Sequence, residues 1–268
     1  MPRRSIHVGF VATAAVAGGL AVALLHRRVD AAPSPASASA RSSIDCSQAV
    51  VAGAKFRVCT FAPAEVDLRL YWKDDAGEQI GDLARLRRVV QGEGRELLLA
   101  MNAGMYGADA DSTPVGLYIE HARELVPLNL RDSAGGSFYY KPNGVFYVAN
   151  GHAGIVDARE FAQRAVHADI ATQSGPLLVT HDSFPHADYG PNGPRLAPRN
   201  AVGVRSDGRV VFVLAETPVN MHELRVALRD RFGCVDALYL DGAISELLVP
   251  PEAPSKRRYG AILAVVAR

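Results

Sequence analysis

Residues 200–245, NAVGVRSDGRVVFVLAETPVNMHELRVALRDRFGCVDALYLDGAIS, decide the fold expected for this chain. The stretch begins with two apolar runs, residues 200–205 and 209–215, on either side of a Ser-Asp-Gly turn. Short apolar runs flanking a glycine-containing turn are typical of an antiparallel β-hairpin. We therefore expect a pair of strands here.

A helix and a third strand are expected after this hairpin. Leu224, Leu228 and Phe232 recur at helical spacing within residues 220–232, and the next apolar run covers residues 235–240. A strand–helix–strand order predicts a right-handed crossover between parallel neighbouring strands. We therefore predict an α+β fold: a twisted, mostly antiparallel sheet with flanking helices and at least one parallel β-α-β crossover near the C-terminus.

The rest of the chain, from residue 44 onward, alternates short apolar runs with turn signals, which is typical of a sheet-rich domain. The predicted elements are paired strands at 56–61 and 66–72, a helix at 82–91, a strand at 96–101, and hairpins over 115–128 and 145–157.

The composition fits one globular domain, which we assign to residues 44–268. Of the 268 residues, 49% are apolar and 21% are charged, and the formal net charge is +1. Such a chain has enough apolar side chains for a sizeable core. A nucleic-acid-binding face needs a dense basic stripe, whereas the short cluster Lys256-Arg257-Arg258 is interpreted as a solvated turn. We therefore expect no nucleic-acid partner.

The N-terminus is predicted to carry an export signal. Residues 8–25 form an uncharged apolar run after Arg3 and Arg4, and a basic start followed by such a run is typical of exported proteins. The run also approaches the length that spans a bilayer. Residues 1–30 are thus a cleaved signal peptide or a membrane anchor, and the Pro/Ser/Ala-rich residues 31–43 are a linker. Either alternative predicts a periplasmic or other extracytoplasmic location.

Three cysteines follow the N-terminal segment. In an oxidising compartment, Cys46 and Cys59 are candidate disulfide partners. Cys234 lies at the end of the predicted C-terminal helix and is interpreted as a buried thiol.

Four segments combine small residues with polar side chains where a strand is expected to begin or end. They are residues 101–106, 173–176, 197–200 and 240–245. Glycine in such segments lets the backbone approach a ligand closely. Taken singly, each Gly-Pro or Asp-Gly pair is typical of an ordinary turn.

Together the segments resemble the phosphodiester glycosidase family, over about residues 56–266. The resemblance rests on NAGMY (102–106), PVGLYI (114–119), KPNGVF (141–146), SGPLLV (174–179), PRNAVGV (198–204) and LYLDGAIS (238–245). Two segments depart from the usual pattern: Ala243 replaces the second glycine of Asp-Gly-Gly-x-Ser, and NAGMY replaces Asn-Gly-Gly-Phe. These departures indicate a bacterial branch of the family.

The resemblance implies an exported hydrolase that cleaves the glycosidic bond of a sugar-1-phosphodiester without a cofactor. Glycosidases use carboxyl groups, and the expected crossover would bring Asp241 and Glu216 to one sheet edge, so these are the catalytic candidates. Arg199 is the phosphate-binding candidate, because a guanidinium forms two parallel hydrogen bonds with phosphate. The other candidate substrate-binding residues are Asn102, Gly104, Ser174, Gly175, Gly242 and Ser245.

Two other functions stay open. The chain would be a non-catalytic envelope protein that binds carbohydrate or sugar phosphate if the fold had lost its chemistry. It would be a phosphodiesterase if it cut the P–O bond. In each case the expected partner is a glycosyl-phosphate small molecule or an envelope glycan.

No metal site is expected. Two polar loops carry potential ligands: His181, Asp182, His186 and Asp188 in one, and Asp109 and Asp111 in the other. Pro185 interrupts the first loop, which excludes a metal-binding helical face there, and we interpret it as a mobile loop beside the active site. The second lacks a complete calcium-binding loop.

Overall fold

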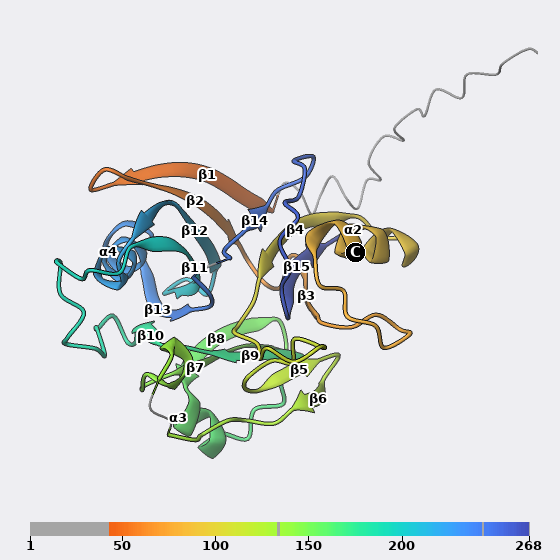
Figure 1. The fold of residues 1–268 in the computed structure, drawn as a ribbon, viewed down its shortest axis with the longest axis horizontal. Helices are drawn as coiled ribbons and strands as arrows, with labels where there is room; N and C mark the ends of the chain where they lie inside the picture. The colour runs from red at the N-terminus through yellow and green to blue at the C-terminus, as the bar shows by residue number, and fades with distance from the viewer. Residues whose placement is uncertain (1–42, 133–134, 243, 268) are drawn as a thin grey trace, which may run out of the picture. The chain divides into compact units, whose positions relative to one another are not determined.

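The computed structural model describes residues 43–132, 135–242 and 244–267 (Figure 1). The predicted signal peptide or anchor at 1–30 lies outside the described residues, and so does nearly all of the predicted linker at 31–43. Within the described residues, no helix has the length and apolarity needed to cross a lipid bilayer.

The described chain forms three antiparallel sheets, the first with six strands. In order across that sheet, the strands are β1 (Ile44–Val51), β2 (Ala54–Phe61), β12 (Val210–Val219), β11 (Ala197–Arg205), β13 (Cys234–Tyr239) and β10 (Leu177–Val179). The predicted hairpin over 200–215 is confirmed as β11 and β12.

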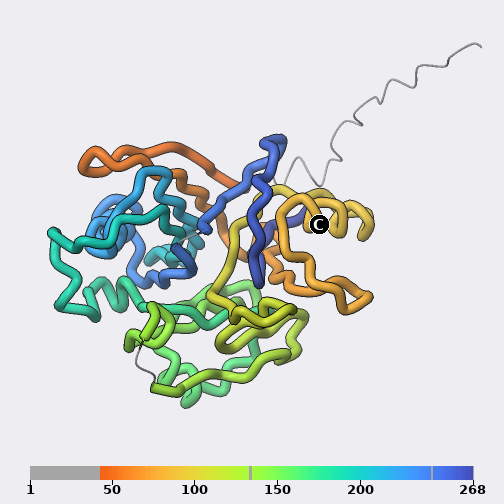
Figure 2. The backbone as a smooth tube through the Cα atoms, viewed as in Figure 1, coloured from red at the N-terminus to blue at the C-terminus, as the bar shows by residue number. Residues whose placement is uncertain are grey.

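The four-stranded sheet joins segments that lie far apart in the sequence. Its order is β14 (Leu247–Leu248), β4 (Leu97–Asn102), β15 (Ile262–Val266) and β3 (Asp67–Tyr71). The C-terminal strand β15 pairs with both β4 and β3, and the path can be followed in Figure 2, where this blue strand runs between the yellow and orange ones.

The five-stranded sheet is built mainly from two hairpins, both predicted from their turns. Its order is β6 (Arg123–Val126), β5 (Tyr118–Glu120), β9 (Ile170–Ser174), β7 (Gly144–Ala149) and β8 (His152–Asp157). Asn150 and Gly151, both at positive φ, make the turn between β7 and β8, because Asn and Gly tolerate this conformation better than other residues do.

The predicted parallel crossover is wrong. Strand β11 lies between β12 and β13 and is antiparallel to both, since Val202 pairs with Phe212 on one side and with Leu238 on the other. The physical reason is edge availability. Strand β2 already covers the free edge of β12, with Phe212 opposite Cys59, so the chain returning from the helix joins the open edge of β11.

The predicted pairing of strands at 56–61 and 66–72 is also wrong. Strand β2 pairs with β1 and β12, whereas β3 pairs with β15 in another sheet. The partner β1 was not predicted, because its side chains are largely exposed and its sequence lacks an apolar run.

Short helices cover the outer faces of the sheets. They are α2 (Leu83–Gly92), α3 (Ala158–Gln163), and α4 (Met221–Val226), which continues into the π-helical turn η2 (Ala227–Arg231); a 3-10 turn, η1, spans Ser137–Tyr139. The predicted helix at 82–91 is confirmed by α2. Asn220 and Glu223 form a capping box at the start of α4, a device that satisfies two otherwise unpaired backbone donors.

One apolar cluster joins the three sheets. It includes Phe212 of the six-stranded sheet, Leu263 of the four-stranded sheet and Phe146 of the five-stranded sheet, all fully buried. A second cluster lies on the other face of the six-stranded sheet, where Leu224 and Leu228 of α4 and η2 pack. The shared cluster holds the ends of β4, β9, β11 and β13 in place.

A disulfide joins Cys46 and Cys59, which are directly opposite each other on β1 and β2 with Cα atoms 4.1 Å apart. The link ties the exposed edge strand β1 to the sheet. Cys234 is buried, and burial raises the pKa of its thiol to about 12.

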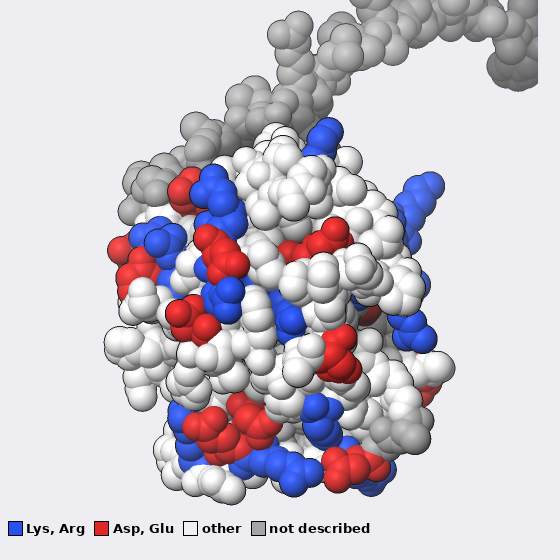
Figure 3. All heavy atoms as spheres, turned by 90° about the vertical axis from the view of Figure 1, so that its left-hand side faces the viewer, with Lys and Arg blue, Asp and Glu red and all other residues white. Residues whose placement is uncertain are grey.

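The face of the protein drawn in Figure 3 mixes acidic and basic side chains. Clusters of opposite sign alternate across it, without a continuous basic surface on that face.

Candidate active site

Three of the four small-residue segments are joined by one buried side chain, that of Asn200 in β11. Its Nδ2 donates to the backbone oxygen of Asn102 at 2.8 Å and to the Oδ1 of Asn102 at 3.0 Å. Its Oδ1 accepts from the backbone N–H of Asp241 at 2.9 Å and from the Ser245 hydroxyl at 3.3 Å. The Asn200 amide therefore holds the end of β4 against the segment that follows β13.

Ser174 connects the fourth segment to the same place. Its hydroxyl, at the end of β9, donates to the backbone oxygen of Leu240 at 2.9 Å. The structure thus gathers Asn102, Ser174 and Ser245 around Asp241. All three side chains are buried, and their hydrogen bonds fix the loops.

Asn200 was not among the predicted site residues, although it lies in the PRNAVGV segment. The sequence feature that could have identified Asn200 as a site residue is its position directly after Arg199. An amide is the side chain that donates and accepts at once, which suits a junction between several loops.

Arg199 is a buried cation with three neutral partners. Its Nε donates to the Val219 oxygen at 2.8 Å, its Nη1 to the Tyr239 hydroxyl at 3.0 Å, and its Nη2 to the Arg195 oxygen at 2.8 Å. A guanidinium has five N–H groups, so two stay available for an anion as far as the described residues go. The neutral acceptors hold the side chain rigidly and leave its charge to attract that anion.

Asp241 lies close enough to Tyr239, the tyrosine that contacts Arg199, to affect its pKa. Strand β13 ends at Tyr239, which is opposite Ala201 of β11, and Asp241 follows two residues later. Burial and, in second place, the Asp241 carboxylate raise the pKa of Tyr106. Burial also raises the pKa of Tyr239 to about 12, with smaller opposing effects from Arg199 and Asp241. Both tyrosines therefore remain protonated at neutral pH.

Glu216 has a different environment from the one expected. Its carboxylate forms an ion pair with Arg57 at 3.1 Å, and Arg57 also pairs with Glu252. Ala215 is opposite Arg199, so the next residue, Glu216, points to the other face of β12. Strand β11 separates β12 from β13, so the two strands are not the neighbours that were expected to bring Glu216 beside Asp241.

The three predicted glycines allow close packing of the loops. A Cβ atom on Gly104 would lie 2.7 Å from the Gln173 oxygen, and one on Gly242 would lie 2.0 Å from the Tyr239 hydroxyl. Gly175 packs similarly against Asn143. A larger residue at Gly104 would push the segments at 101–106 and 173–176 apart, whereas one at Gly242 would displace the Tyr239 side chain that contacts Arg199.

A cavity of about 340 Å³ opens beside Arg199. The residues that line it and matter for the chemistry are Ser137, Asp188, Tyr189, Arg195, Arg199 and His222. Arg195 is exposed, so a second cation faces the same space. Two guanidinium groups at one cavity favour a phosphate or another anion.

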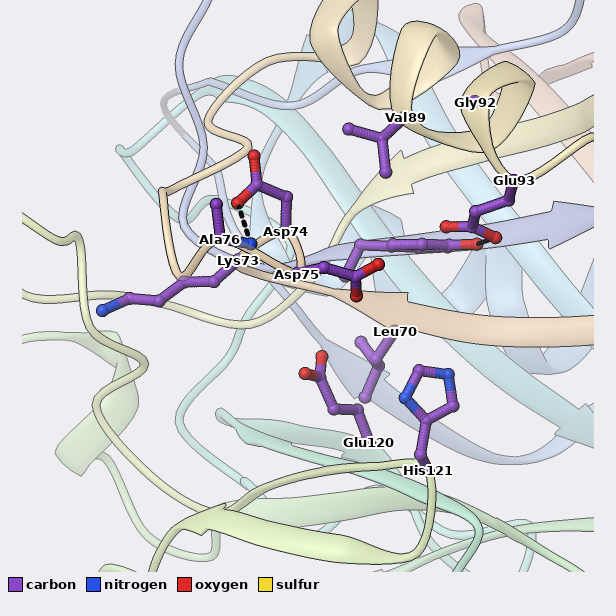
Figure 4. Close-up of a pocket in the computed structure, with 11 residues that line it drawn as sticks. Leu70, Lys73, Asp74, Asp75, Ala76, Val89, Gly92, Glu93, Glu120 and His121 are labelled. Carbon is purple, nitrogen blue, oxygen red and sulfur yellow. Dashed lines mark hydrogen bonds between the residues drawn. The ribbon is translucent and has the colours of Figure 1, made fainter.

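A larger cavity, of about 450 Å³, lies between β3, α2 and the β5–β6 hairpin (Figure 4). In Figure 4 Glu120 and His121 extend from the hairpin below Leu70, with Asp75 and Glu93 above them. Burial raises the pKa of Glu120. Several carboxylates around one space would repel a phosphodiester, so this cavity is not the candidate active site.

The two polar loops considered for metals have other contacts. Asp109 accepts from the Thr113 hydroxyl at 2.9 Å and from the backbone N–H of Asp111 at 3.1 Å, within its own turn. The His186 ring stacks on Tyr140. Over the described ranges, no three His, Cys, Asp or Glu side chains are grouped so that they could hold a metal ion.

Residues 95–266 match the sequence profile of the phosphodiester glycosidase family, and this range contains all four site segments. The chain belongs to the phosphodiester glycosidase family. Membership indicates a hydrolase that acts on phosphodiester glycosides.

Several known proteins are similar to this chain in sequence or in fold. The uncharacterized protein YigE of Escherichia coli K12 is 33% identical over 207 residues, which cover 75% of this chain and 76% of YigE. The catalytic domain of zebrafish N-acetylglucosamine-1-phosphodiester alpha-N-acetylglucosaminidase, auto-inhibited by its pro-peptide, has a similar fold. It superposes with a TM-score of 0.57 at 13% identity, covering 83% of this chain and 81% of that one.

A hypothetical protein from Synechocystis also shares the fold, with a TM-score of 0.52 at 14% identity over 85% of this chain and 62% of its own. At these identities the structural likenesses show the fold alone, and the sequence match supplies the family.

Proposed function

We propose that this protein hydrolyses the glycosidic bond of a sugar-1-phosphodiester, with Arg199 binding the phosphate and Asp241 acting at the sugar. The observation that carries the proposal is Arg199 itself. A buried guanidinium held by three neutral oxygens at the wall of a cavity is suited to a ligand that keeps its negative charge, as a phosphodiester does.

Asp241 supplies the carboxylate that glycoside hydrolysis needs. In the proposed reaction a water oxygen bonds to the anomeric carbon and the bond from that carbon to the bridging oxygen breaks. The phosphomonoester leaves with the bridging oxygen, and the protons of water are shared between the new sugar hydroxyl and the solvent or leaving group. Because a phosphomonoester is a good leaving group, one carboxylate is sufficient for this scheme.

Glu216 remains a predicted catalytic residue, but the scheme does not require it. Its ion pair with Arg57 assigns it a structural role that accounts for its position. A Glu216→Gln variant with normal activity would support the scheme with Asp241 alone.

We also propose that the protein works outside the cytoplasm, on an envelope glycan or a glycosyl-phosphate small molecule. Two features support this location. Residues 8–25 form an apolar run after a basic start, whether cleaved or kept as an anchor, and Cys46 and Cys59 form a disulfide, a bond that persists in oxidising compartments.

The test is hydrolysis of a panel of sugar-1-phosphodiesters by the full chain in water labelled with oxygen-18. We expect the label in the released sugar, because the C–O bond breaks. Label in the phosphate would show that the P–O bond breaks and that the protein is a phosphodiesterase. Binding without turnover would indicate a carbohydrate-binding protein.

Two variants locate the chemistry. Asp241→Asn removes the carboxylate with little change in shape, and we expect kcat to fall at least a hundredfold. Asp207→Asn makes the same change in the exposed β11–β12 turn and serves as the matched control, with unchanged activity. Full activity in folded Asp241→Asn protein would contradict the proposed role.

A further inference from the structure

A second cavity, of about 320 Å³, adjoins the Arg199 cavity and shares Ser137, Asp188, Tyr189 and Arg195 with it. We propose that this second cavity binds the group esterified on the far side of the phosphate, the aglycone, and selects aglycones that contain a ring with a flat apolar face. The proposal rests on the proposed function, because it takes Arg199 as the phosphate site.

Three tyrosines, Tyr139, Tyr140 and Tyr189, line this aglycone cavity, and the buried His186 ring supports Tyr140. Tyr140 stacks on His186 with ring centroids 4.7 Å apart and an angle of 28° between the planes. Tyr189 lies 5.3 Å from Tyr140 and 5.1 Å from His186. Tyr140 is 36% exposed, so part of its ring is accessible to a ligand. Such a surface favours a flat apolar face over an irregular chain.

The order of groups along the site places the aglycone there. Tyr239 contacts Arg199 through its hydroxyl, at 3.0 Å, and Asp241 follows Tyr239 by two residues. Asp241 is not among the residues that line either cavity, whereas Tyr189 lines both. When Arg199 holds the phosphate and the sugar reaches Asp241, the second ester is the group left to occupy the cavity lined by Tyr189 and Tyr140.

Polar groups at the rim select among rings. The Asp188 carboxylate accepts from the Tyr140 hydroxyl, and Ser137 and Arg195 line the same space. A carboxylate, a hydroxyl and a guanidinium recognise ligand hydroxyl or amide groups. A hydroxylated ring, either a pyranose or a nucleoside, satisfies both the aromatic wall and this rim. Glycerol lacks the flat face, and a long polyprenyl chain lacks partners for the polar rim.

Arg225 is the positioning residue for this wall. Its guanidinium donates to the backbone oxygens of His186 and Tyr189 and stands 4.4 Å over the Phe184 ring. The side chain is 5% exposed, and its Nε has no hydrogen-bond partner among the described residues. Helix α4 thus supports both ring-bearing residues through one buried cation, which reaches the Arg199 cavity through Tyr189 and His222.

The experiment compares three diesters of one sugar-1-phosphate, with methyl glucoside, uridine or glycerol as the aglycone. Dissociation constants are measured by calorimetry in the Asp241→Asn protein, so that turnover does not interfere. We expect Tyr140→Ala, added to this background, to weaken binding of both ring-bearing diesters about tenfold, as stacking on one aromatic ring implies. The glycerol diester should change less than twofold.

Tyr140→Phe is the matched control, because it keeps the ring and removes the hydroxyl; we expect ring-bearing diesters to bind within a few-fold of the parent protein. Arg225→Met should reproduce the selective loss of Tyr140→Ala, with a clearly smaller loss for the glycerol diester. Of the two ring-bearing diesters, the one that binds more tightly shows whether the preferred aglycone is a pyranose or a nucleoside.

An equal loss for all three diesters, or no loss, would overturn the aglycone cavity. The same diesters tested for hydrolysis by the unsubstituted chain keep the two proposals separate. Selective binding without hydrolysis would contradict the proposed function and support the cavity assignment. Hydrolysis without selective binding would support the proposed function and contradict the cavity assignment.

Discussion

Replacing Asn200 by aspartate tests whether its amide holds the site together. The change keeps the shape and the acceptor oxygen that serves Asp241 and Ser245. It replaces the Nδ2 donor, which lies 2.8 and 3.0 Å from two oxygens of Asn102, with a third oxygen. A buried carboxylate facing two oxygens is strongly disfavoured.

The loss of stability caused by Asn200→Asp has an upper limit, because a protonated carboxyl group again supplies a hydrogen-bond donor to Asn102. Its folded-state pKa should therefore rise above the unfolded value of about 3.9. Keeping such a group protonated costs about 4 kcal/mol at pH 7 and about 1.5 kcal/mol at pH 5. Because the folded-state pKa is raised, this ionisation costs the variant no stability below about pH 3.9. Above that value the variant becomes less stable than the parent protein as the pH rises.

We therefore expect Asn200→Asp to lower the free energy of unfolding by about 3 to 4 kcal/mol at pH 7 and by about 1.5 kcal/mol at pH 5. Urea unfolding of the oxidised full chain at both pH values measures this. Asn192→Asp, in an exposed loop, is the matched control and should change stability by less than about 0.5 kcal/mol. A loss under 1 kcal/mol at pH 7, or one independent of pH, would refute the reasoning.

Three further predictions concern other parts of the protein. Arg199→Lys keeps a charge but not the fork of N–H donors, so kcat/KM on a hydrolysed sugar-1-phosphodiester should fall at least tenfold, while Arg209→Lys, at the half-buried end of the β11–β12 turn, should have no effect. Cys46→Ser opens a short covalent loop and should lower the free energy of unfolding by about 3 kcal/mol without changing kcat; equal stability in both proteins would contradict this. Because the pKa of Cys234 is about 12, iodoacetamide at pH 8 should modify it only after denaturation, and mass spectrometry of the native protein would detect any earlier reaction.

Local structure was largely predictable from local pattern. The hairpins at 118–126, 144–157 and 197–219 have turn residues between apolar runs, and helix α2 has its apolar spacing and the N-cap Asp82. In each case the pattern and the structure depend on residues near one another in the chain. A turn type or a helical face needs no information from elsewhere.

Sheet order was not predictable in this way. Whether β13 joins β12 or β11 depends on which edge β2 has already covered, and β2 is more than a hundred residues earlier. The expected position of Glu216 beside Asp241 was not found for the same reason, because it required β13 to pair with β12 instead of β11.

In the candidate site, too, some residues were predictable from the sequence and others were decided only by the tertiary structure. The four segments, with Arg199, Asp241, Asn102, Ser174 and Ser245, were recognisable in the sequence through their family resemblance, because close backbone approach and charged chemistry restrict which residues are tolerated. The role of Asn200, the neutral partners of Arg199 and the aromatic wall at Tyr140 and Tyr189 were decided only by the tertiary structure. Each depends on hydrogen bonds or ring contacts between residues remote in the chain, and such contacts are set by how the sheets pack rather than by any local pattern.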